Sequence, residues 1–515
     1  MNDKVNQDSI NKALWAVCDT FRGSISADTY KDFILTMLFL KYISDVWQDH
    51  YEGYQKEYGD EPELIEEMMK SERFVLPKDA SFYALWERRH EPGNGERIDQ
   101  ALHAIEEANG TKLKDAGKSV FQDISFNTDK LGEEKQKNTI LRHVLEDFAK
   151  PELNLKPSRV GTLDVIGNAY EYLIKNFAAS GGQKAGEFYT PPEVSELMAT
   201  LLDPQPGDTI CDPACGSASL LMKCARKVVE NHDSKNYALY GQESIGSTWS
   251  LAKMNMFLHG EDNHKIEWGD TLNNPKLLDK NGDLMLFDVV TANPPFSLDK
   301  WGHENAENDK YGRFRRGVPP KTKGDYAFIL HMIETLKPAS SSKHGGRMGV
   351  VVPHGVLFRG GTEGKIRTSL IEENLLDTVI GLPEKLFYGT GIPAAILIFK
   401  KQKNNDKVLF IDASREFKSG KNQNLLSDDN IAKIIETYKN RTNVDKYAYL
   451  ANLDEIKEND YNLNIPRYVD TFEEEEEIDL MAVRAEREQL KTQLAELEQQ
   501  MESYLEELGY THTNA

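Results

Sequence analysis

The chain has 515 residues, a formal net charge of −22 and 39% apolar residues. A chain of this length exceeds a single hydrophobic core, so we expect several domains, and the composition excludes a disordered or fibrous protein. The acidity also argues against a protein that holds nucleic acid by its own charge, because phosphates attract basic surfaces. If the ligand is DNA, a basic partner or a local basic patch must supply most of the affinity.

Nothing in the sequence indicates a membrane protein or an exported one. The longest apolar stretch, FILTMLFL at 33–40, has eight residues, whereas a membrane-spanning helix needs roughly 20. The N-terminal segment MNDKVNQDSINK lacks the apolar core of a secretory signal, and four cysteines in so long a chain give no disulfide framework. We therefore expect no membrane contact and a location in the reducing cytoplasm.

Residues 1–160 are predicted to form an all-helical domain. Ser9 suits the start of a helix over 10–21, and the segment 30–47 is apolar on all sides. The segments 100–108 and 139–149 are amphipathic at helical spacing. No catalytic cluster stands out here, so we expect a recognition or assembly domain.

Residues 161–420 alternate between short apolar runs and helical patterns, which predicts a mostly parallel, doubly wound α/β sheet. Such sheets bind ligands at the carboxyl ends of their strands. The predicted strands are 208–215, 237–244, 264–270, 287–295, 347–355, 375–383 and 394–401.

The chain becomes polar and helical beyond 420. We expect a polar helical extension over 421–470 and a C-terminal helix or coiled coil over 471–515. The apolar or near-apolar positions of the last segment follow steps of three and four, with Arg487 as the single break, at 480, 483, 490, 494, 497, 501, 504 and 508. This heptad seam favours a partner helix, and one amphipathic helix folded back on its own domain is the alternative.

The segment DPACGSASLL (212–221) joins the first predicted strand of the sheet to a helix. It begins with Asp212, Gly216 permits a sharp turn, and the small residues after it let a ligand approach the backbone at a helix N-terminus. The segment is unlike GxGxxG and lacks the lysine of a phosphate loop, which indicates a nucleotide-like ligand without a pyrophosphate. The small residues are Ser217, Ala218 and Ser219.

Two acids follow at the ends of the next strands. Glu243 ends the second, where a carboxylate can accept hydrogen bonds from both ribose hydroxyls, and Asp270 ends the third, where it could face the base of the ligand. Taken alone, either acid is also what a solvated strand end would carry.

The segment GEFYTPPEVSELMATLL (186–202) precedes the first of these strands. Its prolines suit a helix start, and the residues just before them could wall a ligand, with Thr190 available to bond a carboxylate. The residues expected to line the ligand are Glu187, Phe188, Tyr189, Thr190, Pro191 and Pro192.

The fourth strand ends in TANPPF. Two adjacent prolines stop sheet pairing and fix the direction of the chain as it leaves the strand. The turn presents the Asn293 amide, the backbone carbonyls at Pro294 and Pro295, and the flat ring of Phe296. This set is dispensable for packing and suits a planar substrate.

DPACG, an acid after the second strand, GD after the third and NPPF after the fourth resemble class I S-adenosylmethionine-dependent amino-methyltransferases. The FYTPP element is similar to that of the gamma subgroup of DNA adenine-N6 methyltransferases. With the helical N-terminal domain and helical tail, nearly the whole chain resembles the modification subunit of type I restriction–modification systems.

The resemblance implies a class I S-adenosylmethionine-dependent methyltransferase fold and methyl transfer to the N6 amine of a flipped-out adenine in double-stranded DNA. It implies that the Asn293 side-chain oxygen and the Pro294 carbonyl accept the two amine N–H bonds while Phe296 stacks on the base. Residues 187–192, Ser217 to Ser219 and Glu243 would hold S-adenosyl-L-methionine. The implied partners are a DNA-specificity subunit, which takes two modification subunits, and a further restriction or translocase subunit.

Two other functions remain open. Protein glutamine-N5 methyltransferases also use an NPP-aromatic turn, although with tyrosine at the position of Phe296 and in a shorter chain. An assembly scaffold that binds the cofactor without transfer is the non-enzyme alternative.

Two further patterns, three cysteines and a basic segment, concern metal binding and DNA binding. Cys211, Cys215 and Cys224 lack CxxC spacing, so we expect no metal site. The segment 297–324 carries seven Lys or Arg against four Asp or Glu. We interpret it as a mobile loop that orders over DNA through Arg313, Arg315 and Arg316, with a plain surface insertion as the alternative.

Overall fold

The computed structural model describes residues 6–22, 25–59, 61–115, 117–161, 163–180, 189–340, 345–421, 423–471 and 480–509. The chain divides into two compact units, residues 1–469 and 470–515. Among the described residues, no helix is both long enough and apolar enough to span a bilayer.

The N-terminal part of the first unit is helical, as predicted. Its longest helix, α2 (Ala27–Tyr58), is buried on all sides over 33–45 and forms the centre of this domain. A hairpin of two very short strands, β1 (Lys114–Asp115) and β2 (Lys118–Ser119), is the addition that the sequence did not predict. The other helices are α1 (Gln7–Val17), α3 (Pro62–Lys70), α4 (Phe82–Glu87), α5 (Asn94–Ala108), α6 (Gly110–Leu113), α7 (Glu134–Phe148), α8 (Pro157–Val160) and α9 (Leu163–Ser180).

A nine-stranded sheet forms the rest of this unit, in the order β11-β10-β8-β9-β7-β6-β3-β4-β5. Neighbouring strands run parallel except for β7 with β9, β8 with β9 and β10 with β11. All seven predicted strands are present, and the doubly wound α/β fold is confirmed. The strands are β3 (Thr209–Asp212), β4 (Ala238–Glu243), β5 (His264–Trp268), β6 (Val289–Ala292), β7 (Arg347–Pro353), β8 (Leu376–Gly381), β9 (Ala394–Lys400), β10 (Val408–Asp412) and β11 (Ala448–Ala451).

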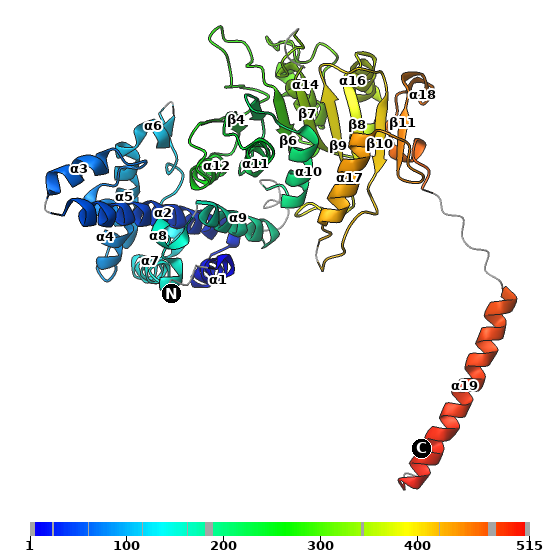
Figure 1. Cartoon of the computed structure of the whole chain (residues 1–515), viewed down its shortest axis with the longest axis horizontal. Helices are drawn as coiled ribbons and strands as arrows, with labels where there is room; N and C mark the ends of the chain where they lie inside the picture. Colours follow the sequence, from blue (N-terminus) through cyan, green and yellow to red (C-terminus); the bar gives the residue numbers. More distant parts are fainter. Residues whose placement is uncertain are drawn as a thin grey trace. The chain divides into compact units, whose positions relative to one another are not determined.

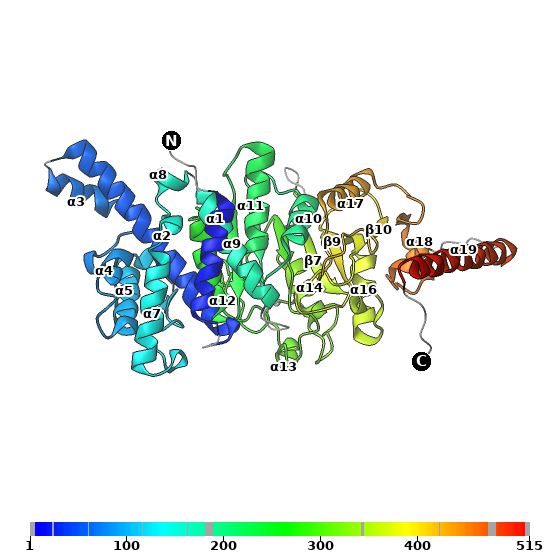
Figure 2. The same ribbon diagram turned by 90° about the horizontal axis from the view of Figure 1, so that it is seen from below.

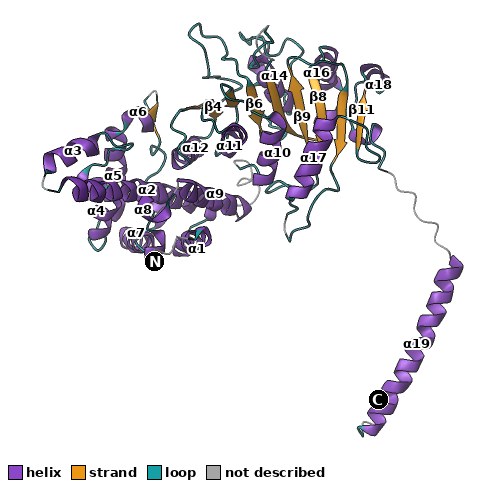
Figure 3. Ribbon diagram, in the orientation of Figure 1, coloured by secondary structure: helices purple, strands orange, loops and turns teal. Residues whose placement is uncertain are grey.

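Helices cover both faces of this sheet (Figure 1). Successive residues of β6 point to opposite faces, so Val289 belongs to the core that contains residues of α10 to α12, and Val290 belongs to the core that contains residues of α14 and α16. Figure 3 shows the strands as one sheet with α10 and α17 over the same face. The helices are α10 (Pro192–Leu202), α11 (Ser219–His232), α12 (Gly246–Leu258), α13 (His303–Ala306), α14 (Asp325–Glu334), α15 (Gly355–Phe358), α16 (Gly361–Glu372), α17 (Asp428–Asn440) and α18 (Leu453–Glu458).

The segment expected to be a polar helical extension, 421–470, is part of the sheet domain. It contains α17 and α18, but between them β11 pairs with β10 and forms an edge of the sheet. The four-residue strand AYLA alternates too briefly to be recognised from its sequence, and residues up to 469 belong to the first unit.

The second unit contains α19 (Leu480–Glu507), a single helix as predicted. Its apolar seam is exposed to solvent, since every described member is at least half exposed. These members are Val483, Leu490, Leu494, Leu497, Met501 and Tyr504, followed by Leu508 just past the helix. Residues 472–479, which include the whole acidic run FEEEEE (472–477), lie outside the described residues.

The helical domain packs against α12 and β5 of the sheet domain. Helix α9 contacts α1, α2 and α12, and Figure 2 shows it between α1 and α11. The Lys118 ammonium donates to the Trp268 carbonyl at 2.7 Å. Asp123 lies so close to Gly246 that a Cβ there would approach its carboxylate to 2.3 Å.

We expect Gly246→Val to loosen this contact. Its side chain would collide with Asp123 and with the rigid Trp268 ring, 2.7 Å from the added Cβ, and such overpacking typically costs about 1–3 kcal/mol. Thermal unfolding should show a lower Tm than the wild type. The control for glycine replacement is Gly53→Val, at an exposed position of α2 with open space around it, which should keep the Tm close to that of the wild type. An unchanged Tm for Gly246→Val would show that the two domains do not depend on this close approach.

Candidate active site

Four of the predicted site residues lie at one edge of the sheet. Strands β6, β3, β4 and β5 are consecutive neighbours and run parallel, so their carboxyl ends align. Asp212 and Glu243 are the last residues of β3 and β4, Asp270 follows β5 by two residues, and Asn293 follows β6 directly.

A cavity of about 600 Å³ opens at this edge. Of the predicted residues, Glu243, Asp270, Asn293, Pro295 and Phe296 line it. Its remaining walls come from the turns after β3, β4, β5 and β6, from α14 and from the helical domain. These residues are Lys31, Pro213, Ala214, Ser244, Ile245, Ser247, Thr248, Thr271, Ser297, Leu298, Asp299 and Phe328.

The turn formed by residues 293–296, hereafter the NPPF turn, meets the FYTPP segment inside this site. The Asn293 amide Nδ2 donates to the Thr190 hydroxyl at 3.2 Å, although the two residues are 103 positions apart. Within the described part of the chain, no hydrogen bond is made to the Asn293 Oδ1. That oxygen is therefore available as an acceptor at the cavity wall.

Phe296 is held by a ring that sequence reasoning missed. Its ring centroid lies 5.8 Å from that of Phe387 with an interplanar angle of 67°, an edge-to-face pair. Phe387 and Tyr388 belong to the connection between β8 and β9, and Tyr388 packs in turn against Tyr189. The run LFYGTG at 386–391 could have indicated this contact. Aromatic residues beside glycines are unusual in a long connection between strands, and functional residues often lie in such loops.

The described part of the FYTPP segment, residues 189–192, contacts the NPPF turn but does not line the cavity. Tyr189 is buried and burial raises its pKa, so it supports the wall while Thr190 makes the contact with Asn293. Pro191 and Pro192 begin α10, as the sequence predicted. Glu187 and Phe188 lie outside the described residues.

The DPACG turn shapes the cavity from behind, and only Pro213 and Ala214 reach its surface. Gly216 has φ +54° and Ala218 has φ +64°, which are the left-handed conformations that bring the chain sharply into α11. The Ser217 and Ser219 hydroxyls are 2.9 Å apart and bond each other. Among the described residues, the predicted ligand contacts Asp212, Gly216, Ser217, Ala218 and Ser219 do not line the cavity.

Two buried carboxyl groups stand next to each other beneath this turn. Glu243 accepts from the Gly216 N–H at 3.0 Å and from the Ile245 N–H at 2.9 Å, and burial raises its pKa. Asp212 accepts from the Ala214 N–H at 2.9 Å, and burial, with the nearby Glu243, raises its pKa to about 8. Burial therefore favours the protonated form of both carboxyl groups, and a cationic ligand would favour their ionised form.

Asp270 is already engaged in its own turn. Its Oδ1 accepts from the N–H groups of Leu272 and Asn273 at 2.9 and 3.1 Å, and its Oδ2 accepts from the Asn273 amide at 2.7 Å. This pattern is an Asx turn that shapes the rim, so the carboxylate faces the cavity with much of its bonding capacity used.

The segment 297–324 is not a free basic loop. Trp301 and Phe314 are buried, and the Arg313 side chain pairs with Asp309 at 2.8 Å. Arg316 is also buried, bonded to Glu334 at 2.7 Å and Glu373 at 2.6 Å. The third arginine, Arg315, is about half exposed and pairs with Glu334 at 2.5 Å. The interpretation of a mobile segment is wrong at the buried Arg313 and Arg316, whereas contact of the segment with DNA stays a prediction. Composition revealed their charge but could not reveal the acids that neutralise it.

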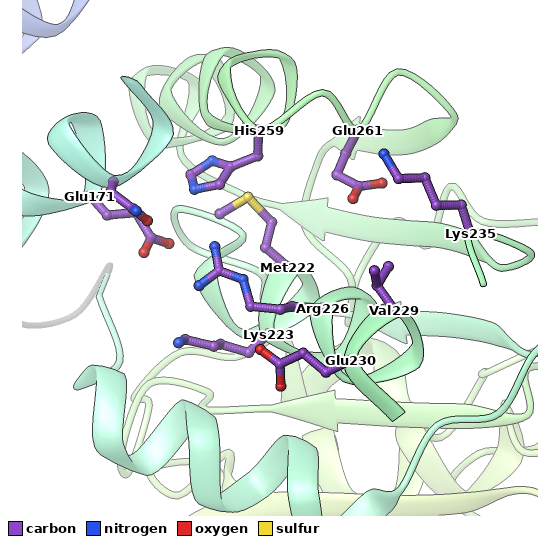
Figure 4. Close-up of a pocket in the computed structure, with 10 residues that line it drawn as sticks. Glu171, Met222, Lys223, Arg226, Val229, Glu230, Lys235, His259 and Glu261 are labelled. Atoms are coloured by element: carbon purple, nitrogen blue, oxygen red, sulfur yellow. The ribbon is translucent and has the colours of Figure 1, made fainter. Parts of the chain in front are cut away.

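A second cavity, of about 460 Å³, lies between α9, α11 and the residue after α12 (Figure 4). Figure 4 shows Arg226 and Lys223 pointing into the same space as Glu171, so the walls mix both charge signs. It contains none of the predicted site residues. The cavity at the strand ends is therefore the candidate active site.

The comparison with known proteins agrees with this geometry. Residues 161–477 match the family model "N-6 DNA Methylase", and residues 10–148 match the "HsdM N-terminal domain". The fold, the strand-end site and this match place the chain among the N-6 DNA methylases.

Within this class, the chain belongs to the methylase subunits of type I restriction enzymes. It is 34% identical to the MjaVIII methylase subunit of Methanocaldococcus jannaschii over 98% of this chain and 86% of that protein. It is 30% identical to the MpnII methylase subunit of Mycoplasma pneumoniae over 92% and 91% of the two chains. The crystal structure of a type I restriction-modification methyltransferase subunit from Streptococcus thermophilus shares 37% identity with a TM-score of 0.78, covering 91% of this chain and 100% of that one.

The raised pKa of Asp212 gives a pH-dependent stability. The folded chain keeps a proton up to about pH 8 that the unfolded chain loses near pH 3.8. The group therefore lowers the free energy of unfolding as the pH rises through this interval, by at most about 1.4 kcal/mol per pH unit. Since Asp212→Asn cannot ionise, its stability relative to the wild type should increase across the same interval, as measured by urea unfolding at several pH values. A difference that stays constant with pH would contradict the burial of an ionisable Asp212.

Proposed function

We propose that this chain transfers a methyl group from S-adenosyl-L-methionine to the N6 amine of an adenine extruded from double-stranded DNA. The observation that carries the proposal is the shared cavity, in which the NPPF turn and Glu243 face one space of about 600 Å³. This volume lies in the range of cavities that hold a small ligand.

The residues of the cavity fit this cofactor. Ile245 is 54% exposed and lies two residues after Glu243, so it offers an apolar surface to an adenine ring beside a carboxylate suited to ribose hydroxyls. Among the charged residues that line the cavity, Glu243, Asp270 and Asp299 outnumber Lys31, and negative charge favours a cationic sulfonium. When bound, this cofactor supplies an electrophilic methyl group.

The NPPF turn would hold the target amine. An exocyclic N6 amine is a poor nucleophile because its lone pair is delocalised into the ring. The Asn293 Oδ1 and the Pro294 carbonyl can accept its two N–H groups and draw the nitrogen toward a pyramidal geometry. Such alignment and polarisation lower a barrier without a covalent intermediate.

Phe296 would stack on the flipped base, with Phe387 packed against its edge. Extruding a base costs a few kcal/mol, and stacking of about 1–3 kcal/mol offsets part of that cost. No general base is required by this arrangement, which agrees with the absence of a histidine among the residues that line the cavity in the described part of the chain.

A separate specificity subunit would choose the DNA site. The net charge of −22 leaves little basic surface for a duplex. The exposed seam of α19 has the spacing that a partner helix requires. We propose two copies of this chain on each specificity subunit, and a restriction or translocase subunit as a further partner.

Two alternatives are separated from this proposal by their products. A protein glutamine-N5 methyltransferase would label protein, and the phenylalanine at 296 in place of tyrosine argues against it. A scaffold without transfer would bind the cofactor only, and the available Asn293 oxygen at the cavity wall argues against that.

Asn293→Ala should abolish methyl transfer to DNA while leaving cofactor binding nearly unchanged, because Glu243 and Ile245 lie on another strand end. The test is tritiated methyl incorporation into DNA by the complex with the specificity subunit, beside calorimetric binding of S-adenosylhomocysteine.

A matched control is Asn281→Ala, an exposed asparagine outside the cavity, which should retain full activity. Label on protein instead of DNA would favour glutamine methylation, and no label from the wild type would favour the scaffold.

Charge placed on the seam of α19 should prevent assembly. The double substitution Leu490→Glu with Leu497→Glu puts carboxylates at positions that are more than half exposed and seven residues apart. We expect loss of co-purification with the specificity subunit and unchanged binding of S-adenosylhomocysteine. The control, Thr492→Glu with Gln499→Glu, has the same spacing on another face and should assemble normally. If both double variants co-purify with the specificity subunit to the same extent, the seam is not part of the interface.

A further inference from the structure

The exit of the NPPF turn is fixed by a residue that is far from it in the sequence. Ser297, the next residue, has φ +52°, a left-handed conformation that the local sequence does not favour. Its N–H donates to the Asp325 Oδ1 at 2.7 Å, and the following Leu298 carbonyl accepts from the Gly324 N–H at 3.0 Å. The start of α14 therefore anchors the turn at two points.

Asp325 is part of a buried charged cluster. It is 2% exposed, and its Oδ2 accepts from the Arg359 guanidinium at 2.6 Å. Arg359 also donates to both oxygens of Glu363, at 2.5 and 2.9 Å. One cation is thus shared by two buried carboxylates. Both of these lie in the first turn of a helix, where the helix dipole favours negative charge.

The geometry around Arg359 leaves little freedom. A Cβ at Gly355 would lie 2.5 Å from an Arg359 Nη atom, so the lack of a side chain at Gly355 leaves room for the guanidinium. The backbone carbonyl of Arg359 accepts from Arg367 at 2.9 Å. Because Arg359 follows β7 and Ser297 follows β6, the cluster ties the ends of two neighbouring strands together.

We infer that the Asp325–Arg359 pair is a positioning element for the target base, which rests on the proposed function of the NPPF turn. Neither Asp325 nor Arg359 lines the cavity. By holding Ser297, the pair sets where Phe296 and Asn293 stand relative to the cavity. A displacement of about 1 Å at such a site can reduce a rate by about a hundredfold.

Asp325→Ala is the primary test. In the complex with the specificity subunit, we expect kcat for DNA methylation to fall by about tenfold to a hundredfold, with KM for S-adenosyl-L-methionine unchanged. With 2-aminopurine at the target position, the fluorescence gain on binding should change, because the base loses its fixed stacking partner. Asp325→Asn keeps an oxygen that can accept from Ser297, so it should recover part of the lost kcat.

The matched control is Asp288→Ala. Asp288 directly precedes β6, at the end of that strand opposite to the NPPF turn. Asp288 is also buried, accepts from Thr209 at 2.8 Å and pairs with Lys337 at 2.6 Å, but it is far along the strand from the turn. Both alanine variants should lower Tm, whereas only Asp325→Ala should lower kcat per folded enzyme, counted by S-adenosylhomocysteine binding.

Equal kcat for Asp325→Ala and the wild type, or equal losses for Asp325→Ala and Asp288→Ala, would overturn the inference. If Asp325→Ala does not fold, Asp325→Asn decides alone, and wild-type kcat and fluorescence in that variant would also overturn it. A wild-type complex with no transfer to DNA would instead refute the proposed function.

Discussion

Strand β6 is hydrogen-bonded in parallel to β3 on one side and to β7 on the other. This pairing makes its carboxyl end coincide with those of β3, β4 and β5, so that residues separated by up to 81 positions, from 212 to 293, meet at one edge. Two prolines then prevent the chain from continuing the ladder. The polar groups of the turn can face a cavity only because the sheet stops there.

Two acids at this edge of the sheet are buried, although burial disfavours their charged form. Asp212 and Glu243 are both buried and adjacent, and their pKa values are raised. Folding alone gains nothing from such a pair, and burying charge without a counterion destabilises a protein. By contrast, Asp325 is buried with Arg359 beside it. Of these acids only Glu243 lines the cavity, where it would face a cationic ligand, whereas Asp325 holds the backbone that follows the NPPF turn.

The sequence was most informative where function resides in short local turns. DPACG, the strand-end acids and NPPF could be located because Gly, Pro and small residues have strong backbone preferences that act within a few positions. The position of Phe387 against Phe296 could not be predicted, since it depends on the pairing of β8 and β9 about 90 residues later. Lys31 could not be predicted to line the cavity either, because it belongs to α2 and its place depends on how the helical domain packs against the sheet domain. Charge counting failed at Arg313 and Arg316, because the sequence does not show that Asp309 pairs with Arg313 or that Glu373 folds back onto Arg316. Residues such as Ser217 and Ser219, expected on the cavity surface, form its frame instead.

The bare seam of α19 has a consequence for the abundance of the chain. The described seam residues of this 28-residue helix, from Val483 to Tyr504, are at least half exposed, so the helix gains little beyond its own hydrogen bonds and a partner helix would stabilise it. Chains synthesised in excess of that partner would expose this apolar seam to one another and to proteases. The amount of active enzyme would then follow the scarcer component rather than the total synthesis of this one.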